Sequence, residues 1–155
     1  MNKSIRRAIA LVLALSALVL CFASCGSNAN KIHVTVAIYG LENGEDSIWL
    51  GREMQIDEGK NADEAVAMLN ELVSTLSYTK DNSGMYDSFK NGNDKLKIPS
   101  QKALGDDTVE YYHIGWRLNG EVQSQIDNPK KLSDHVMQEG DRVELFIQKD
   151  ILKQN

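Results

Sequence analysis

Alternation of apolar and polar residues in separate segments most constrains how this chain can fold. Such alternation is typical of a β-strand with one buried face. The clearest segments are Lys31 to Tyr39, Thr108 to Leu118 and Arg142 to Gln148. A run from Ile48 to Ile56 also alternates, and Asn43-Gly44 before it favours a tight hairpin turn. The chain is therefore predicted to build its core on a sheet that begins with two antiparallel strands.

One helix is predicted between these strands. Asn61 stands at an N-cap position with Glu64 three residues later, which is the capping-box arrangement. Apolar residues then recur at spacings of three and four, as on one face of a helix. This stripe consists of Ala65, Met68, Leu69, Leu72, Val73 and Leu76. The element order predicts an α+β fold, with one main helix on a mixed sheet of about five strands. A β-sandwich is the alternative if the helix is misread.

The segment from Thr79 to Asp107 is rich in Asn, Asp, Ser, Lys and Gly, and we expect a long irregular excursion that can include short strands. Its scattered apolar residues are Tyr86, Phe89, Leu96 and Ile98. Later in the chain, Asn119-Gly120 favours a tight turn and Val122 to Ile126 a short returning strand. Pro129 can begin a short helical turn.

Strand alternation predicts which aromatic residues face solvent. If Ile48, Leu50, Met54 and Ile56 point to the core, Trp49 lies on the opposite, open face of the sheet. Tyr111 and His113 share that outward parity, whereas Trp116 is predicted to be buried. An exposed Trp often marks a contact site. In the alternative interpretation, Trp49 covers the sheet edge or lies under the 79–107 excursion.

The first 25 residues predict export and lipid attachment. Lys3, Arg6 and Arg7 precede an apolar run from Ala8 to Ala23, which is the layout of a secretory leader. Phe22-Ala23-Ser24-Cys25 resembles the bacterial lipobox, so we expect cleavage before Cys25 and lipidation of that residue. Cys21 lacks the small residues before it that cleavage requires. A membrane-spanning anchor is the alternative, because the run approaches the length needed to cross a bilayer.

The predicted organisation is thus a signal peptide at residues 1–24, a lipidated Cys25 with a short tether at 25–30, and one domain at 31–155. Both cysteines fall within the first 25 residues, so the predicted domain contains no disulfide. The leader carries three of the 17 basic residues and none of the 22 acids, which leaves a formal charge of −8 on the remainder. Nucleic acid is therefore an improbable partner. We expect an extracytoplasmic protein held at the bacterial cell membrane by its lipid.

A hairpin, one capped helix and a closing Gly-Asp turn before a last strand together resemble the ubiquitin-like β-grasp. More narrowly, the chain resembles bacterial domains related to the C-terminal domain of transcobalamin, which often occur in exported, lipid-anchored proteins. The matching segments are Val34 to Ile38, Gly115 to Gly120 and Glu139 to Glu144. Here Arg117 follows Trp116, where that family more often has an aromatic residue. The resemblance implies a binding domain, with corrinoid contact known in the eukaryotic relatives.

Catalytic and metal-binding patterns are not visible in the sequence. Ser133-Asp134-His135 contains the residue types of a triad, but adjacent side chains diverge. His33, His113 and His135 lack the spacing of a metal site, and we expect no metal. The chain also has no phosphate-binding loop or cofactor fingerprint. We therefore expect no enzymatic activity and no certain cofactor.

The functional hypothesis is a non-enzymatic binding domain, for which a small molecule such as a corrinoid is one candidate ligand. A surface interaction or scaffold domain for a protein or glycan is the alternative. Candidate binding residues are Trp49, Tyr111 and His113 on the open sheet face, with Tyr86 and Phe89 in the excursion. A pocket walled by aromatic residues would favour the small molecule, and an exposed edge or face a macromolecule.

Overall fold

The computed structural model describes residues 30–105, 107–125 and 128–153, and residues 31–155 cluster as one compact unit. Its main sheet has the order β2-β1-β11-β7-β6, with β8 also paired to β7. The strands of this sheet are β1 (Lys31–Glu42), β2 (Glu45–Asp57), β6 (Lys102–Gly105), β7 (Thr108–Leu118), β8 (Glu121–Val122) and β11 (Arg142–Lys153). Strand β1 runs parallel to β11, and the other pairs are antiparallel. The sheet is therefore mixed, as predicted.

Two hairpins of this sheet are closed by Asn-Gly turns. Asn43 and Gly44 both have positive φ between β1 and β2, and Asn119 and Gly120 do so between β7 and β8. Asn tolerates this backbone region and Gly enters it without steric cost, which is why the pair suits a two-residue turn. Both turn predictions are confirmed.

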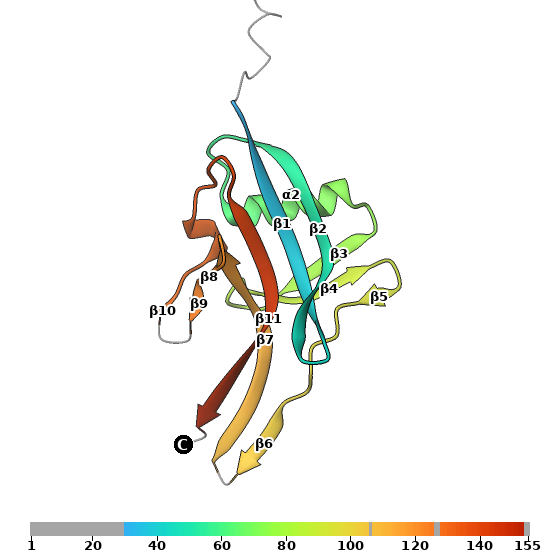
Figure 1. Ribbon diagram of the computed structural model, residues 1–155, viewed down its shortest axis with the longest axis vertical. Helices are drawn as coiled ribbons and strands as arrows, with labels where there is room; N and C mark the ends of the chain where they lie inside the picture. The colour runs from blue at the N-terminus through green and yellow to red at the C-terminus, as the bar shows by residue number, and fades with distance from the viewer. Residues whose placement is uncertain (1–29, 106, 126–127, 154–155) are drawn as a thin grey trace, which may run out of the picture. The chain divides into compact units, whose positions relative to one another are not determined.

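Helix α2 (Ala62–Leu72) begins at the predicted capping box. Asn61 Oδ1 accepts from the Glu64 backbone N–H and Glu64 Oε2 accepts from the Asn61 N–H, each at 2.9 Å. The helix packs Ala65, Val66 and Leu69 into the core. Figure 1 shows α2 lying across one face of the main sheet.

The predicted helix stripe is wrong at its C-terminal end. Helix α2 stops at Leu72, whose side chain is 62% exposed, and Val73 is its C-cap. The following Ser74 and Thr75 are poor helix formers, and Leu76 N–H donates to Val73 C=O as the chain turns away. Leu76 is buried, but as the first residue of a strand.

The 79–107 segment is more ordered than predicted. It contributes to a three-stranded antiparallel sheet formed by β3 (Leu76–Lys80), β4 (Tyr86–Asn91) and β5 (Asp94–Lys95). Tyr86, Phe89 and Leu96 join the same hydrophobic core as α2. The polar composition of the segment reflects its outward side chains, while every few residues an aromatic or aliphatic group points inward.

A β-bulge changes the predicted faces of β2. Ile38 is opposite Leu50, but the next residue Tyr39 is opposite Ile48, so Trp49 is the extra residue. One inserted residue reverses the face of every side chain beyond it. Ile48 is consequently 63% exposed rather than buried, and Trp49 packs against the core. The interpretation in which Trp49 lies on the open face is wrong. The alternative, that it lies under the 79–107 segment, agrees with the structure, because its indole Nε1 donates to Asp94 in β5 at 2.8 Å.

The remaining segments are a hairpin that contacts β7 and a 3₁₀ turn that contacts α2. Strands β9 (Ser124–Gln125) and β10 (Asn128–Pro129) form a small hairpin, followed by a 3₁₀ turn η1 at Leu132–Asp134. Pro129 thus lies in a strand, and the predicted helical turn begins three residues later. Trp116 is 1% exposed and donates from Nε1 to the Lys130 carbonyl at 2.9 Å, which confirms its predicted burial.

The described residues therefore form a mixed α+β domain with one α-helix. The predicted leader and Cys25 lie outside the described residues. Among the residues the structure describes, no helix is long and apolar enough to cross a membrane.

Candidate functional site

A cleft of about 450 Å³ lies along one edge of β7, between the parts of that edge paired with β6 and β8. Five parts of the chain line it: the β3–β4 turn with β4, the segment before β6, the middle of β7, the β9–β10 hairpin and the end of β11. Three tyrosines, Tyr86, Tyr111 and Tyr112, contribute to its surface. It is therefore an aromatic site assembled from distant segments.

Tyr111 and His113 form one wall of the cleft. Their rings stack with centroids 5.5 Å apart, and His113 Nε2 is 2.6 Å from Asp150 Oδ2 on β11. Both side chains of this His–Asp pair are largely shielded from solvent. The imidazole is thus held in a fixed orientation by a ring on one side and a carboxylate on the other.

Tyr86 belongs to the opposite wall. Its ring stacks on Phe89 with centroids 5.2 Å apart, and its hydroxyl donates to Asp63 Oδ1 at 2.8 Å. Lys80 Nζ donates to the same carboxylate at 2.6 Å and lies 4.5 Å from the Tyr86 ring centroid. Burial is the main reason that the pKa of Tyr86 is raised well above its ordinary value, and the hydrogen bond to Asp63 adds to it. The tyrosine therefore stays protonated as a hydrogen-bond donor.

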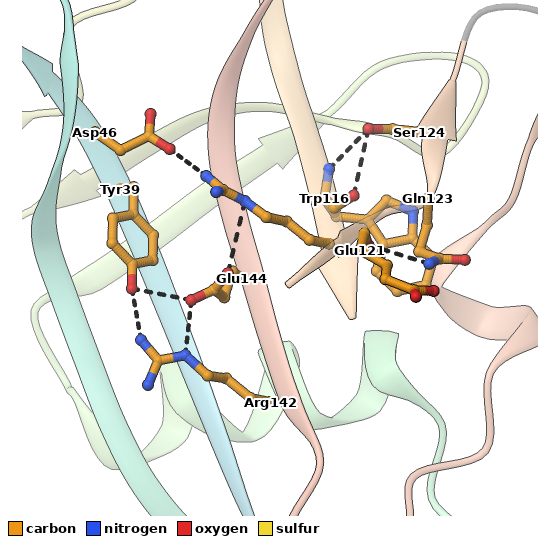
Figure 2. Close-up of polar contacts among 9 residues, drawn as sticks. Tyr39, Asp46, Trp116, Glu121, Gln123, Ser124, Arg142 and Glu144 are labelled. Atoms are coloured by element: carbon orange, nitrogen blue, oxygen red, sulfur yellow. Dashed lines mark hydrogen bonds and ion pairs between the residues drawn. The ribbon is translucent and has the colours of Figure 1, made fainter. Parts of the chain in front are cut away.

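The β9–β10 hairpin closes one end of the cleft through Ser124. As Figure 2 shows, Ser124 Oγ reaches the backbone of Trp116, accepting from its N–H at 2.9 Å. The same hydroxyl donates to Gln148 Oε1 at 2.6 Å. A Cβ built on Gly115 would lie 2.3 Å from Gln148 Oε1 and 2.6 Å from Ser124 Oγ, so a larger residue would have to displace these two side chains. Gly115 thus lets the hairpin approach β7 closely enough to form the end of the cleft.

Three of the predicted site residues meet in this cleft, namely Tyr86, Tyr111 and His113. Phe89 is fully buried behind Tyr86, and Trp49 does not line the cleft. Sequence reasoning missed Ser124, Lys130 and Asp150. The pairing of Asp150 with His113 had no local signal, since the contact depends on the register of β11 against β7.

A second polar cluster lies on the sheet face that α2 does not cover. Arg117 reaches Asp46 and lies over the Phe146 ring, with its Cζ 4.1 Å from the centroid. Glu144 Oε1 accepts from Tyr39 OH at 3.0 Å and from Arg142 Nε at 2.7 Å, as Figure 2 shows. Arg117 Nε is buried without a hydrogen bond, 3.6 Å from Glu144 Oε2, while the other charged groups named here pair with one another. The cluster is therefore an internal network that holds β1, β2, β7 and β11 together.

The other histidines are occupied by carboxylates. His33 Nδ1 is 3.2 Å from Glu139 at an exposed position, and His135 Nε2 is 2.8 Å from Asp141. Ser133 contacts Asp134, not His135, so these three residues do not form a catalytic triad. Among the described residues, no group of three His, Cys, Asp or Glu side chains is arranged to hold a metal ion.

In comparisons with known proteins, no protein-family model matches this chain, and no curated protein gives a significant match.

Proposed function

We propose that this protein is an exported, lipid-anchored, non-enzymatic binding domain that captures its ligand in the β7 cleft. The observation that carries the proposal is the convergence of Tyr86, Tyr111 and His113 on one concave site. Concave sites with aromatic walls and a few oriented polar groups are typical of ligand binding. Attachment through Cys25 would hold the domain close to the membrane, where capture of an extracytoplasmic ligand is useful.

The chemistry of the cleft supports binding rather than catalysis. Ser124, His113 and Asp150 all line it, and these are the residue types of a nucleophile, a base and an orienting acid. However, the Ser124 hydroxyl bonds to Gln148 and to the Trp116 backbone, and His113 Nε2 faces Asp150. The His113–Asp150 contact is one that a triad would also need, but the described residues show no hydrogen bond between Ser124 and His113. The Ser124 hydroxyl donates its proton to Gln148 instead of to a base, as in a structural network.

The size of the cleft bears on the ligand. Ligand pockets span roughly 300–1,000 Å³, and this cleft lies in the lower half of that range. A compact organic molecule would fit within it, whereas a corrinoid, with its macrocycle and nucleotide tail, would enter only in part. A corrinoid remains a candidate ligand only if one end of the molecule binds in the cleft and the rest stays outside it.

The β-grasp relationship is part of the same proposal. It is supported by the order of the main sheet, in which the first and last strands are parallel neighbours at the centre and β2 and β7 flank them. The alternative function, a surface domain that recognises a protein or glycan, is favoured by the position of the cleft along a strand edge.

Native mass spectrometry of the full protein purified from membranes of its own source tests the proposal. We expect a mass excess from a co-purified ligand, with visible absorbance if the ligand is a corrinoid. Tyr111→Ala and His113→Ala should lose this excess. His33→Ala is the matched control, because His33 also pairs with a carboxylate but lies outside the cleft. If all variants carried the same amount of co-purified ligand, the ligand would have to bind outside the β7 cleft.

A further inference from the structure

The outer edge of β7 is paired at both ends and open in the middle. Near its start, Glu110 is opposite Lys102 of β6, and near its end Arg117 is opposite Val122 of β8. Trp116 completes the second pairing, since its N–H donates to Ser124 Oγ and its C=O accepts from the Gln123 N–H at 2.9 Å. The stretch from Tyr111 to Gly115 is left between them.

Backbone groups of Tyr112 and Ile114 point out of this open stretch. In an antiparallel strand, the N–H and C=O of successive residues point alternately to the two sides. The backbone N–H and C=O of Trp116 point away from β11. Because Ile114 and Tyr112 are two and four residues earlier in the strand, their N–H and C=O groups point the same way. The described part of the chain records no hydrogen-bond partner for these groups on the outer side. Both residues also line the cleft.

We propose that this edge binds a short extended segment of another protein by β-strand addition. The inference rests on the proposed function, because it names the ligand class of the same cleft. Two residues that each offer a donor and an acceptor, spaced by one strand repeat, match the backbone of an extended peptide. A compact organic molecule does not present that repeat.

The walls of the cleft suit the alternating side chains of an added strand. On the side that faces α2, Tyr86, Met85 and Ile98 offer an apolar surface. On the other side, the stacked Tyr111 and His113 rings lie along the edge. Successive residues of an extended peptide point to opposite sides, so one side chain would enter each wall.

Charge at the hairpin end specifies the segment further. Lys130 and Lys131 are exposed, line the cleft, and have no ion pair in the described part of the chain. Three carboxylates also line the cleft, those of Asp81, Asp87 and Asp150, but each already accepts a hydrogen bond within the domain. The Lys130 carbonyl accepts from Trp116 Nε1, which places this residue on the side of the sheet that faces α2. The segment should therefore carry an acidic residue two positions from its apolar residue, so that both lie on that side.

The flanking pairs limit the length of the segment. Residues 111–115 of β7 extend about 17 Å at roughly 3.4 Å per residue, which is room for four or five residues. Strand β6 and the β9–β10 hairpin close the two ends, so a longer chain must turn away from the sheet on both sides. The geometry fits a short exposed loop of a partner protein.

Amide hydrogen exchange in the full-length protein, followed by NMR in detergent micelles, tests the open edge directly. In the free protein, the Tyr112 and Ile114 amides should exchange at least about tenfold faster than those of His113 and Gly115, which face β11. The probe is a library of capped heptapeptides with an apolar residue two positions from Asp or Glu. Saturation with a binding peptide should slow exchange at Tyr112 and Ile114 by about tenfold or more.

Methylation of single peptide amides gives the second readout. Only alternate peptide N–H groups face β7, so N-methylation should abolish binding at every second position and leave it nearly unchanged at the others. Lys130→Glu with Lys131→Glu should reduce binding of the acidic peptides at least about tenfold. The matched control is Lys90→Glu with Lys95→Glu, a lysine pair outside the cleft.

Two results would overturn the inference: no library peptide binds, or the bound peptides leave exchange at Tyr112 and Ile114 unchanged. If a small co-purified ligand then occupies the cleft by native mass spectrometry, the proposed function stands and only the peptide inference fails. If no ligand of either kind depends on Tyr111 and His113, both proposals fail together.

Discussion

Gly115 and Ser124 lie so close that a Cβ on Gly115 would be 2.6 Å from the Ser124 hydroxyl oxygen. Gly115→Ala must therefore displace both Ser124 and Gln148, which together anchor the β9–β10 hairpin to the sheet. We expect a loss of about 1–3 kcal/mol in the free energy of unfolding, as for other overpacked sites. Denaturant unfolding measures the loss. Gly105→Ala is the control, because nothing lies within 4 Å of a Cβ there. Equal stability of the two variants would contradict the close packing.

Truncation of the two leucines near the end of α2 should affect stability to very different extents. Leu69 is fully buried, so Leu69→Ala leaves a cavity and should lower the free energy of unfolding by about 2–5 kcal/mol. Leu72 is largely exposed, so Leu72→Ala should change it by no more than about 0.5 kcal/mol. Thermal or denaturant unfolding distinguishes the two. A large loss in the free energy of unfolding for Leu72→Ala would instead support the longer helix stripe predicted from the sequence.

Stability should depend on the ionisation of Asp141. Burial acts to raise the pKa of Asp141, but hydrogen bonds from His135, Asn119 and the Gln138 backbone outweigh it and hold the pKa below its ordinary value. A carboxyl with a depressed folded pKa contributes stability that is complete above its unfolded pKa and is lost as pH falls through the folded pKa. The difference in the free energy of unfolding between the wild type and Asp141→Asn should therefore shrink as pH falls from about 5 toward 2.

Urea midpoints across this pH range measure the effect. Asp107→Asn, which removes an exposed carboxylate, gives the baseline for a change of net charge. A stability difference between wild type and Asp141→Asn that does not vary with pH would show that the Asp141 carboxylate does not act through its charge.

Membrane attachment should depend on Cys25. If Cys25 carries the lipid, Cys25→Ala should move the protein from the membrane fraction to the soluble one or leave its leader uncleaved, because a peptide tether alone gives no affinity for the bilayer. Cys21→Ala should have no effect. Fractionation with intact-mass analysis checks both variants. An unlipidated N-terminus in the wild type would refute the assignment.

Local features of the fold were predictable because each depends on a few neighbouring residues. Alternation identified β1, β7 and β11, and the Asn-Gly pairs identified two turns. The capping box of α2 was predictable for the same reason, since Asn61 and Glu64 satisfy each other's backbone donors regardless of what packs around them. Burial of Trp116 followed from strand parity.

What the sequence by itself determined is thus a set of local elements: the long strands β1, β7 and β11, the helix start, the two Asn-Gly turns and the α+β class. Only the tertiary structure decided which side Trp49 occupies, because one bulged residue reverses the faces of a strand and no local signal marks it. It also decided that Leu72 faces solvent. The cleft is likewise tertiary, because Tyr86, His113 and Asp150 meet only through the pairing of β7 with β11 and the packing of β4 beneath them. Contacts between distant segments depend on that assembly and leave no periodic pattern in the chain.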